Sequence, residues 1–285
     1  MKNSAGCLFL AFGEAHLVLS LVAIRSLKEK NSNLSIQLIT NVDVNLDCFD
    51  FWDNDFDVLT HLTLETDKNR LIKTNLIEYT VFDKTLFIDS DALINGNICK
   101  IFEFSKKFDL GIKLNWRPQT IKEKSNYRIS KNLSVGEFSH WNSGVILFNR
   151  NASTKLFFKK WQENFVEISS PFDQPSLAKT LYSMPELKFI SLDERWNSSG
   201  PVFNRQKWSR WVKIFHYTNM ITPKVFNEIE KLDSVLKLQN IKTDKAVALL
   251  KSRIERRRKR LGFFRSSLIS LLLRYNSLYN KNLIY

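Results

Sequence analysis

Two aspartates separated by one residue are the side chains of this sequence whose spacing most directly suggests chemistry. Asp89 and Asp91 follow the apolar segment Thr85–Ile88, with no basic residue next to either. Because alternate residues of an extended chain point to the same side, both carboxylates can lie together where a strand ends. Two clustered carboxylates repel each other unless a cation joins them, and oxygen ligands suit Mg²⁺ or Mn²⁺, which in turn suits a diphosphate. The sequence therefore predicts a divalent-cation site after a strand.

The same spacing occurs twice more, in the acidic stretch 48–57. The pairs are Asp53 with Asp55 and Asp55 with Asp57. No clean strand pattern runs into this stretch, so we interpret its aspartates as solvated loop carboxylates. The prediction for Asp89 and Asp91 depends instead on the elements around them.

Hydrophobic periodicity predicts the elements that must position the two aspartates. A buried strand over 7–12, an amphipathic helix over 16–30 and a strand over 34–40 form a strand–helix–strand unit, which requires parallel pairing. The pattern predicts further strands at 85–88, 108–114, 144–149, 187–191 and 212–216, and helices at 69–79, 153–165 and 176–182. This alternation indicates an α/β fold with an open, mostly parallel sheet. Such sheets bind ligands beyond the carboxyl ends of their strands, where Gly13 and the two aspartates fall.

Composition indicates a folded protein with a basic C-terminal segment. The 285 residues are 44% hydrophobic and 13% aromatic, which is sufficient for one large α/β domain with an appendage. Of the net charge of +14, the segment from Lys251 to Tyr285 carries +9, from ten Lys or Arg residues and one Glu. We expect residues 1–225 to form the main domain and residues 226–285 a helical extension.

Cysteine usage and the N-terminal segment suggest where the protein resides. Cys7, Cys48 and Cys99 show no metal-ligand spacing and are odd in number, which favours a reducing compartment. The N-terminal apolar run is short and lacks a suitable cleavage site, so we do not expect a signal peptide. No apolar run approaches the roughly twenty residues that a bilayer span needs. The expected location is the cytoplasm, including the cytoplasmic face of the membrane.

The basic tail has two interpretations. Residues 251–260 are mostly Lys and Arg, and residues 261–275 are rich in Leu, Phe and Ser. One interpretation is a solvated charge run ahead of a packed terminal helix. The one we favour is a basic amphipathic helix on an anionic membrane surface, because each Lys or Arg near such a surface contributes about 1 kcal/mol and the apolar face inserts among the headgroups. Nucleic acid is not an expected partner, since no stacking aromatics are interleaved with the charge.

Four later segments place polar residues at the ends of predicted elements, and each also has an ordinary interpretation. Asn142-Ser143-Gly144 precedes a strand and is typical of a turn. Asp173-Gln174 begins a helix, where Asp173 is compatible with a simple cap. Trp196-Asn197 reads as a loop, and His216 ends a strand as a packed or exposed imidazole would.

Taken in order, these segments resemble the nucleotide-sugar glycosyltransferases of the GT-A fold, and most closely the retaining enzymes of glycosyltransferase family eight, the glycogenin-like and lipopolysaccharide galactosyltransferase-like group. The resemblance covers roughly residues 5 to 225. Lys73 matches that family's helical Lys before the Asp-x-Asp strand, and His216 matches its metal-site His. Its Asn-Ser-Gly-Val segment corresponds to residues 142–145, its Asp-Gln pair to residues 173–174 and its Tyr/Trp-Asn segment to residues 196–197. The sequence departs after His216, where the family continues with Gly and then Lys-Pro-Trp and this chain offers Lys224 instead.

The resemblance implies a metal-dependent hexosyltransferase that uses a UDP-sugar and acts on a glycan, glycolipid or protein acceptor. It implies Mn²⁺ or Mg²⁺ as the metal, acting as a Lewis acid on the departing diphosphate. By the resemblance, the metal ligands are Asp89, Asp91 and His216. The donor is bound by Phe12 or His16 near the base, together with Gly13, Arg70, Lys73, Ser90 and Lys224. Asp173 and Gln174 stabilise the oxocarbenium-like sugar, and Asn142 holds sugar hydroxyls.

Three alternatives remain open from the sequence. In an inverting GT-A enzyme, Asp173 would be a candidate general base. A sugar-nucleotide pyrophosphorylase is disfavoured, because no Gly-rich loop follows the first strand. A catalytically silent member of the fold, serving as a membrane-associated scaffold, is suggested by the altered segment after His216.

Overall fold

A computed structural model provides the structure of the protein and describes residues 4–55, 57–115, 128–130, 133–134, 140–198, 211–216 and 222–255. The strands are β1 Ala5–Ala11, β2 Ser35–Thr40, β3 Val58–His61, β4 Lys84–Ile88, β5 Ala92–Ile94, β6 Leu110–Leu114, β7 Arg128–Ser130, β8 Leu133–Ser134, β9 Trp141–Asn149, β10 Phe189–Leu192 and β11 Ile214–His216. The helices are α1 Glu14–Lys28, α2 Asn69–Lys73, α3 Ala152–Ile168, α4 Gln174–Tyr182 and α6 Thr222–Leu238, with 3-10 turns at Thr66–Lys68, Leu76–Glu78 and Cys99–Lys106.

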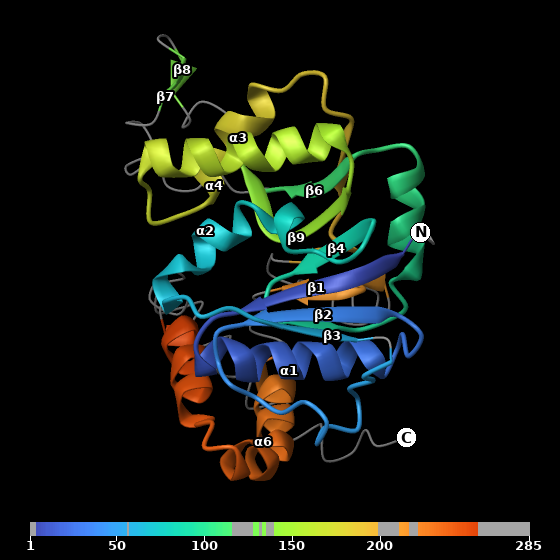
Figure 1. The fold of residues 1–285 in the computed structure, drawn as a ribbon, viewed down its shortest axis with the longest axis vertical. Helices are drawn as coiled ribbons and strands as arrows, with labels where there is room; N and C mark the ends of the chain where they lie inside the picture. The colour runs from blue at the N-terminus through green and yellow to red at the C-terminus, as the bar shows by residue number, and fades with distance from the viewer. Residues whose placement is uncertain are drawn as a thin grey trace, which may run out of the picture.

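Seven strands form one mixed, mostly parallel sheet in the order β10-β6-β9-β4-β1-β2-β3. β1 pairs in parallel with both β2 and β4, and the outer pairs β2–β3 and β10–β6 are also parallel. β9 runs antiparallel between β4 and β6. The predicted α/β class with an open, mostly parallel sheet and flanking helices is confirmed (Figure 1).

Helices cover both faces of the sheet, and the alternation along β1 shows how the core divides. Cys7, Phe9 and Ala11 point to the layer that holds α1 and α6, whereas Leu8 and Leu10 point to the layer that holds α3 and α4. In Figure 1, α3 and α4 lie above the sheet and α1 and α6 lie below it. Both faces of the central strands are therefore buried, as the nearly continuous apolar runs of a parallel sheet require.

Two predicted elements differ from those observed. The helix predicted at 69–79 is interrupted, because α2 ends at Lys73 and a 3-10 turn follows at Leu76–Glu78. The strand predicted at 212–216 is β11, but it lies outside the main sheet and pairs antiparallel with β5, which directly follows the two aspartates. A three-residue strand carries no local signal for its partner, and this pairing turns out to build the site.

The acidic stretch also differs from its interpretation as solvated loop. Asp57 is buried and accepts hydrogen bonds from the backbone N–H of Ile36 at 2.9 Å and from Lys28 Nζ at 2.8 Å. Asp53 and Asp55 are exposed, as expected. Asp57 is therefore a structural carboxylate that ties the loop to α1 and β2.

The chain after β11 continues on the α1 side of the sheet. Val225, Ile229 and Leu232 of α6 are buried in the apolar layer that contains α1, and a second helical segment follows at 244–255. Residues 256–285, which hold most of the basic amphipathic tail, lie outside the described residues. Within the described ranges, none of the helices combines the length and apolar character required to cross a bilayer.

Candidate active site

The two aspartates occupy a turn between β4 and β5 at the carboxyl end of the sheet. The backbone N–H of Asp89 donates to the Gly144 carbonyl at 2.8 Å, which continues the β4–β9 ladder by one residue. The N–H of Ala92 then donates back to the Asp89 carbonyl at 3.2 Å and closes the turn. The strand end and the turn thus place both carboxylates on one side, as the residue spacing predicted.

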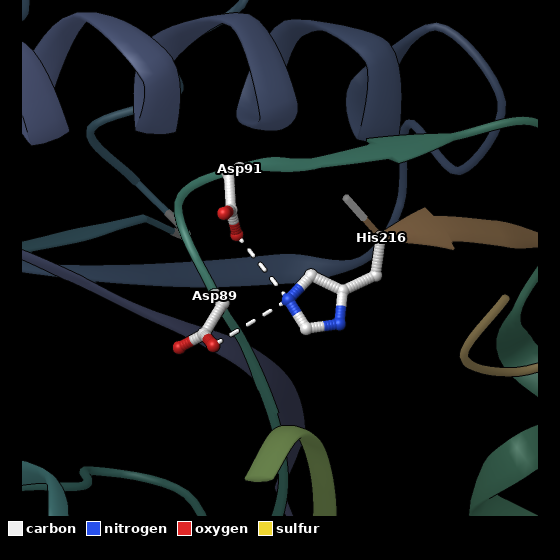
Figure 2. Close-up of side chains that lie close together, drawn as sticks. All are labelled: Asp89, Asp91 and His216. Atoms are coloured by element: carbon white, nitrogen blue, oxygen red, sulfur yellow. Dashed lines mark ion pairs between the residues drawn. The ribbon is translucent and has the colours of Figure 1, made fainter. Parts of the chain in front are cut away.

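The antiparallel pairing of β11 with β5 brings His216 to the aspartates. His216 is paired with Ala92, the residue next to Asp91. Its Nε2 atom lies 3.3 Å from Asp91 Oδ1 and 3.6 Å from Asp89 Oδ2. The three ligand atoms lie within 4.8 Å of one another, and Figure 2 shows the carboxylates and the imidazole converging on one point. The predicted set Asp89, Asp91 and His216 is therefore one cluster in space.

A chain of hydrogen bonds that begins at a backbone N–H fixes the tautomer of His216. The N–H of Gly144 donates to Asn142 Oδ1 at 2.9 Å, so that atom is an acceptor. The same oxygen contacts Asn197 Nδ2 at 3.1 Å, which must therefore donate, and this turns Asn197 Oδ1 toward His216 Nδ1 at 3.1 Å. His216 consequently donates from Nδ1. Its Nε2 is left to face the two carboxylates.

Gly144 provides the space for this imidazole. A Cβ atom at position 144 would overlap His216 Cε1 and would lie 2.5 Å from Nδ1 and 2.6 Å from Nε2, well inside ordinary contact distance. His216 itself is 2% exposed. The interpretation of Asn142-Ser143-Gly144 as a turn is therefore wrong: the segment lies within β9, where Asn142 orients the imidazole through Asn197 and Gly144 makes room for it.

The donor set fits a divalent cation. A neutral imidazole with its proton on Nδ1 presents a lone pair at Nε2, and a lone pair facing two carboxylates at 3.3 and 3.6 Å is repulsive. A divalent cation between these three groups would replace that repulsion by attraction. Carboxylate oxygens suit Mg²⁺ and Mn²⁺, and an imidazole oriented by a hydrogen bond at its other nitrogen is the usual form of a metal-binding His.

Basic side chains reach both aspartates in space, although none adjoins them in sequence. Lys73 Nζ lies 2.8 Å from Asp89 Oδ1 and 3.5 Å from Asp173 Oδ2. Burial alone would lower the Lys73 pKa, but the charges of Asp89 and Asp173 outweigh it and raise the pKa. Arg253, from the helix near the C-terminus, donates from Nη1 to Asp91 Oδ2 at 2.6 Å. Lys73 is therefore a permanent cation between the aspartate cluster and Asp173.

Asp173 is turned into the site and does not cap its helix. It occupies the N-cap position of α4, yet its side chain makes no capping hydrogen bond and instead accepts from Ser143 Oγ at 2.6 Å. Burial alone would raise the Asp173 pKa, but the Lys73 charge and the Ser143 hydrogen bond outweigh it and lower the pKa. Asp173 is thus an ionised carboxylate. Gln174 follows it as the first residue of α4 and is half-buried.

The residues predicted to contact the donor do not all lie beside the two aspartates. Ser90 lies 2.9 Å from His16 Nδ1 through its Oγ, which places His16 beside the two aspartates. Gly13 adopts a left-handed φ of 81° at the N-cap of α1, and its N–H donates to Asn41 Oδ1 at 2.7 Å. Phe12 is fully buried in the layer of α3 and α4, because it continues the face of β1 that carries Leu10. Phe12 therefore offers no exposed surface to a base, whereas His16 contacts the residue between the two aspartates.

Two basic residues predicted to assist with phosphate lie at the surface. Arg70 is exposed on α2, where its guanidinium lies 5.7 Å from the centroid of the Phe172 ring. Its charge also contributes to lowering the pKa of Asp173. Lys224 is exposed in the first turn of α6, and the segment 217–221 between it and His216 lies outside the described residues. Their roles toward phosphate stay predictions.

Sequence reasoning did not assign the roles of Asn197 and Arg253. Asn197 carried a signal, since it belongs to a segment that completes the resemblance, and only its contact with His216 was missing. Arg253 lies 162 residues from Asp91 in a run of basic residues. Nothing in that run distinguishes it from its neighbours.

Comparison with known proteins identifies one family and one fold. The family model described as Glycosyl transferase family 8 matches residues 67–224, more than half of the chain. Among curated protein sequences, none matches this chain. Similar solved structures include the bifunctional glycosyltransferase WbbM in its apo form, with a TM-score of 0.56 and 12% identity over 80% of this chain and 50% of that one.

Two other similar structures are matched over nearly their whole length. The galactosyltransferase LgtC, solved in complex with donor and acceptor sugar analogues, gives a TM-score of 0.52 and 13% identity over 79% of this chain and 95% of that one. Mouse xyloside xylosyltransferase 1 gives 0.54 and 15% over 76% and 98%. At these identities the likeness shows the fold alone, and it confirms the predicted GT-A fold.

Proposed function

Because the chain belongs to glycosyl transferase family 8 and is a nucleotide-sugar-dependent glycosyltransferase, we propose that it transfers a hexose from a UDP-sugar to a glycan, glycolipid or protein acceptor with retention of configuration. In this proposal Asp89, Asp91 and His216 bind Mn²⁺ or Mg²⁺. The observation that carries the proposal is the convergence of these three side chains, with His216 held in the ligand tautomer by Asn197. The structure of LgtC with donor and acceptor sugar analogues supports the substrate class.

The residues around the cluster provide the charge that donor cleavage needs. A divalent cation bound there would supply Lewis-acid chemistry to the departing diphosphate. Lys73 keeps its proton, since Asp89 and Asp173 raise its pKa, and it places a fixed positive charge between the diphosphate and sugar sides of the site. Preorganised charges of this kind usually contribute more to the rate than a single proton transfer does.

Asp173 is the residue best suited to the sugar. It is buried, ionised and held by Ser143 and Lys73, so its charge can stabilise an oxocarbenium-like carbon without reorganisation. Gln174, next to it, adds an amide for the sugar hydroxyls. Asn142, by contrast, uses its carbonyl oxygen within the protein, for Gly144 and Asn197.

The low pKa of Asp173 also favours retention over inversion. An inverting enzyme needs a base that takes the acceptor proton, and an effective base has a pKa near the working pH. The pKa of Asp173 is displaced in the opposite direction. In a retaining reaction the leaving phosphate oxygen itself can take that proton, and Asp173 then needs only to keep its charge. Proton NMR of the first-formed product would show the retained anomer, and an inverted product would contradict this proposal.

We further propose that the tail beyond the described residues attaches the protein to an anionic membrane on the cytoplasmic side. The support is the sequence itself, in which five consecutive basic residues at 256–260 precede a Leu- and Phe-rich stretch. Flotation with vesicles that contain phosphatidylglycerol should be lost on deletion of residues 256–285. Unchanged flotation would remove the membrane proposal and leave the enzymatic one intact.

A screen of UDP-sugars with Mn²⁺, which measures UDP release, tests the enzymatic proposal. Wild-type protein should release UDP from at least one donor, and Asp89→Asn and Asp91→Asn should abolish that release. Asp55→Asn is the matched control, because Asp55 has the same Asp-x-Asp spacing and is exposed. Metal-independent turnover by the double variant would overturn the metal assignment. Wild-type protein that is neither active nor thermally stabilised by UDP with Mn²⁺ would favour a catalytically silent scaffold.

A further inference from the structure

The helical segment near the C-terminus is fixed against the beginning of α1. Lys245, near the start of segment 244–255, pairs through Nζ with Glu14 Oε2 at 2.8 Å, in the first turn of α1. Ala246 is fully buried in the apolar layer that contains α1. Figure 1 shows this segment in red, passing the N-terminal end of α1 toward α2. It therefore borders the carboxyl end of β1, where the site lies.

Arg253 projects from this segment into the site. It follows Lys245 by eight residues, just over two turns, so the two side chains lie roughly 80° apart around the helix axis. Its Nη1 donates to Asp91 Oδ2 at 2.6 Å, and its side chain is only 21% exposed. The other oxygen, Asp91 Oδ1, is the one that faces His216 Nε2 at 3.3 Å. Arg253 and a cation can therefore hold different oxygens of the same carboxylate.

The charge balance of the site gives Arg253 a role once a cation is bound. Asp89, Asp91 and Asp173 face two buried or half-buried cations, Lys73 and Arg253, which leaves one excess negative charge. A divalent cation would convert this excess into one positive charge, which attracts a diphosphate. Without Arg253, the same site with its cation would be neutral, and the attraction would weaken.

The guanidinium is also suited to phosphate by shape and surroundings. Its planar set of N–H donors matches phosphate oxygens in pairs, which a Lys ammonium cannot do. Partial burial reduces screening of its charge by water. The electrostatic effect of Arg253 reaches the beginning of α1, because burial and, after it, the charge of Arg253 lower the pKa of His16.

We propose that Arg253 is a donor-binding residue, whose guanidinium orients Asp91 and contacts the diphosphate of the nucleotide donor, so that the helical segment 244–255 forms one wall of the donor site. This inference rests on the proposed function, because it adds a residue to the site that binds the same donor. It implies that the C-terminal segment belongs to the catalytic domain in function.

Calorimetric titration of the full-length protein with UDP and with UMP, in the presence of Mn²⁺, tests this role. Arg253→Ala should weaken UDP binding by about 10- to 100-fold, the usual effect of losing a charged hydrogen-bond partner, and should weaken UMP binding less. Arg253→Lys should fall between the wild type and Arg253→Ala. Lys251→Ala is the matched control: it removes one exposed positive charge from the same helical segment and should leave both affinities unchanged.

The result that overturns the inference is UDP binding by Arg253→Ala that equals or exceeds that of the wild type. Tighter binding would identify Arg253 as a competitor of the cation. Equal losses for UDP and UMP would overturn its contact with the diphosphate. Circular dichroism verifies folding, and Arg253→Lys decides the question if the Ala variant is unfolded. Wild-type protein that does not bind UDP with Mn²⁺ would instead refute the proposed function, so the two failures are distinct.

Discussion

Gly144→Ala tests the geometry of the metal site, because the added methyl group displaces the His216 imidazole without changing any of the three proposed metal ligands. The new methyl group would overlap His216 Cε1 and lie 2.5 Å from Nδ1 and 2.6 Å from Nε2. The imidazole must move by about 1.5 Å to restore van der Waals contact between its Cε1 and the new Cβ. It has little space to do so, because His216 and Asn197 are both buried. We therefore expect Mn²⁺ affinity to fall by about 10- to 100-fold, as when the support of a metal ligand is removed.

The same substitution should also destabilise the protein, by roughly 1–3 kcal/mol for an overpacked site. Calorimetry would measure Mn²⁺ affinity in the presence of UDP, and urea unfolding would measure stability. Gly111→Ala is the control for stability, because a Cβ there would lie 3.2 Å from Leu147 Cβ, in the core of the sheet. It should cost stability and leave Mn²⁺ affinity unchanged.

A double variant separates a clash with His216 from any other effect of the methyl group. In a His216→Ala background the imidazole is gone, so Gly144→Ala should cause no further loss of Mn²⁺ affinity and should cost less stability than in the wild type. Wild-type Mn²⁺ affinity in the Gly144→Ala single variant would show that the metal does not require the imidazole where the structure places it.

Three further predictions concern residues that the structure assigns to definite contacts. Asn197→Ala should lower Mn²⁺ affinity by about 10-fold or more in the same titration, because His216 Nδ1 loses the acceptor that fixes its tautomer; an unchanged affinity would exclude this role. Asp173 has a folded-state pKa below the ordinary 3.8, so its ionisation stabilises the protein above that pH and the stability is lost as the pH falls through the folded-state pKa. Urea midpoints between pH 2.5 and 6 should accordingly depend less on pH in Asp173→Asn than in the wild type, and parallel curves would contradict the prediction. Asp57→Ala should destabilise by roughly 3–5 kcal/mol, because it leaves Lys28 buried without its carboxylate, whereas exposed Asp55→Ala should have almost no effect; similar unfolding midpoints for the two variants would show that Asp57 is not structural.

The sequence was sufficient for six strands of the main sheet and for the location of the aspartates, but it did not predict the edge strand β3. β1, β2 and β4 are apolar runs buried on both faces, and such runs are visible in any single sequence. The position of Asp89 and Asp91 at the end of β4 followed from that run alone. The inward orientation of Phe12 was also accessible, since it shares the face of Leu8 and Leu10 by simple alternation.

Other features depend on contacts between residues far apart in sequence. β11 is only three residues long, and its own pattern does not show that it pairs with β5 rather than with the main sheet. Asp57 is buried because Lys28 reaches it from α1, which no local pattern in an acidic loop reveals. Arg253 is one of several basic residues in its segment, and only the packing of that segment beside α1 selects it.

The electron spin echo of Mn²⁺ bound to the protein, with and without UDP, shows whether His216 is a ligand of the metal that the donor diphosphate meets. We expect modulation from one ¹⁴N nucleus of His216, additional coupling to ³¹P when UDP is added, and loss of the ¹⁴N modulation in His216→Ala. Bound Mn²⁺ without nitrogen modulation in the wild type would contradict the proposed site, because His216 would then not be a ligand of the metal.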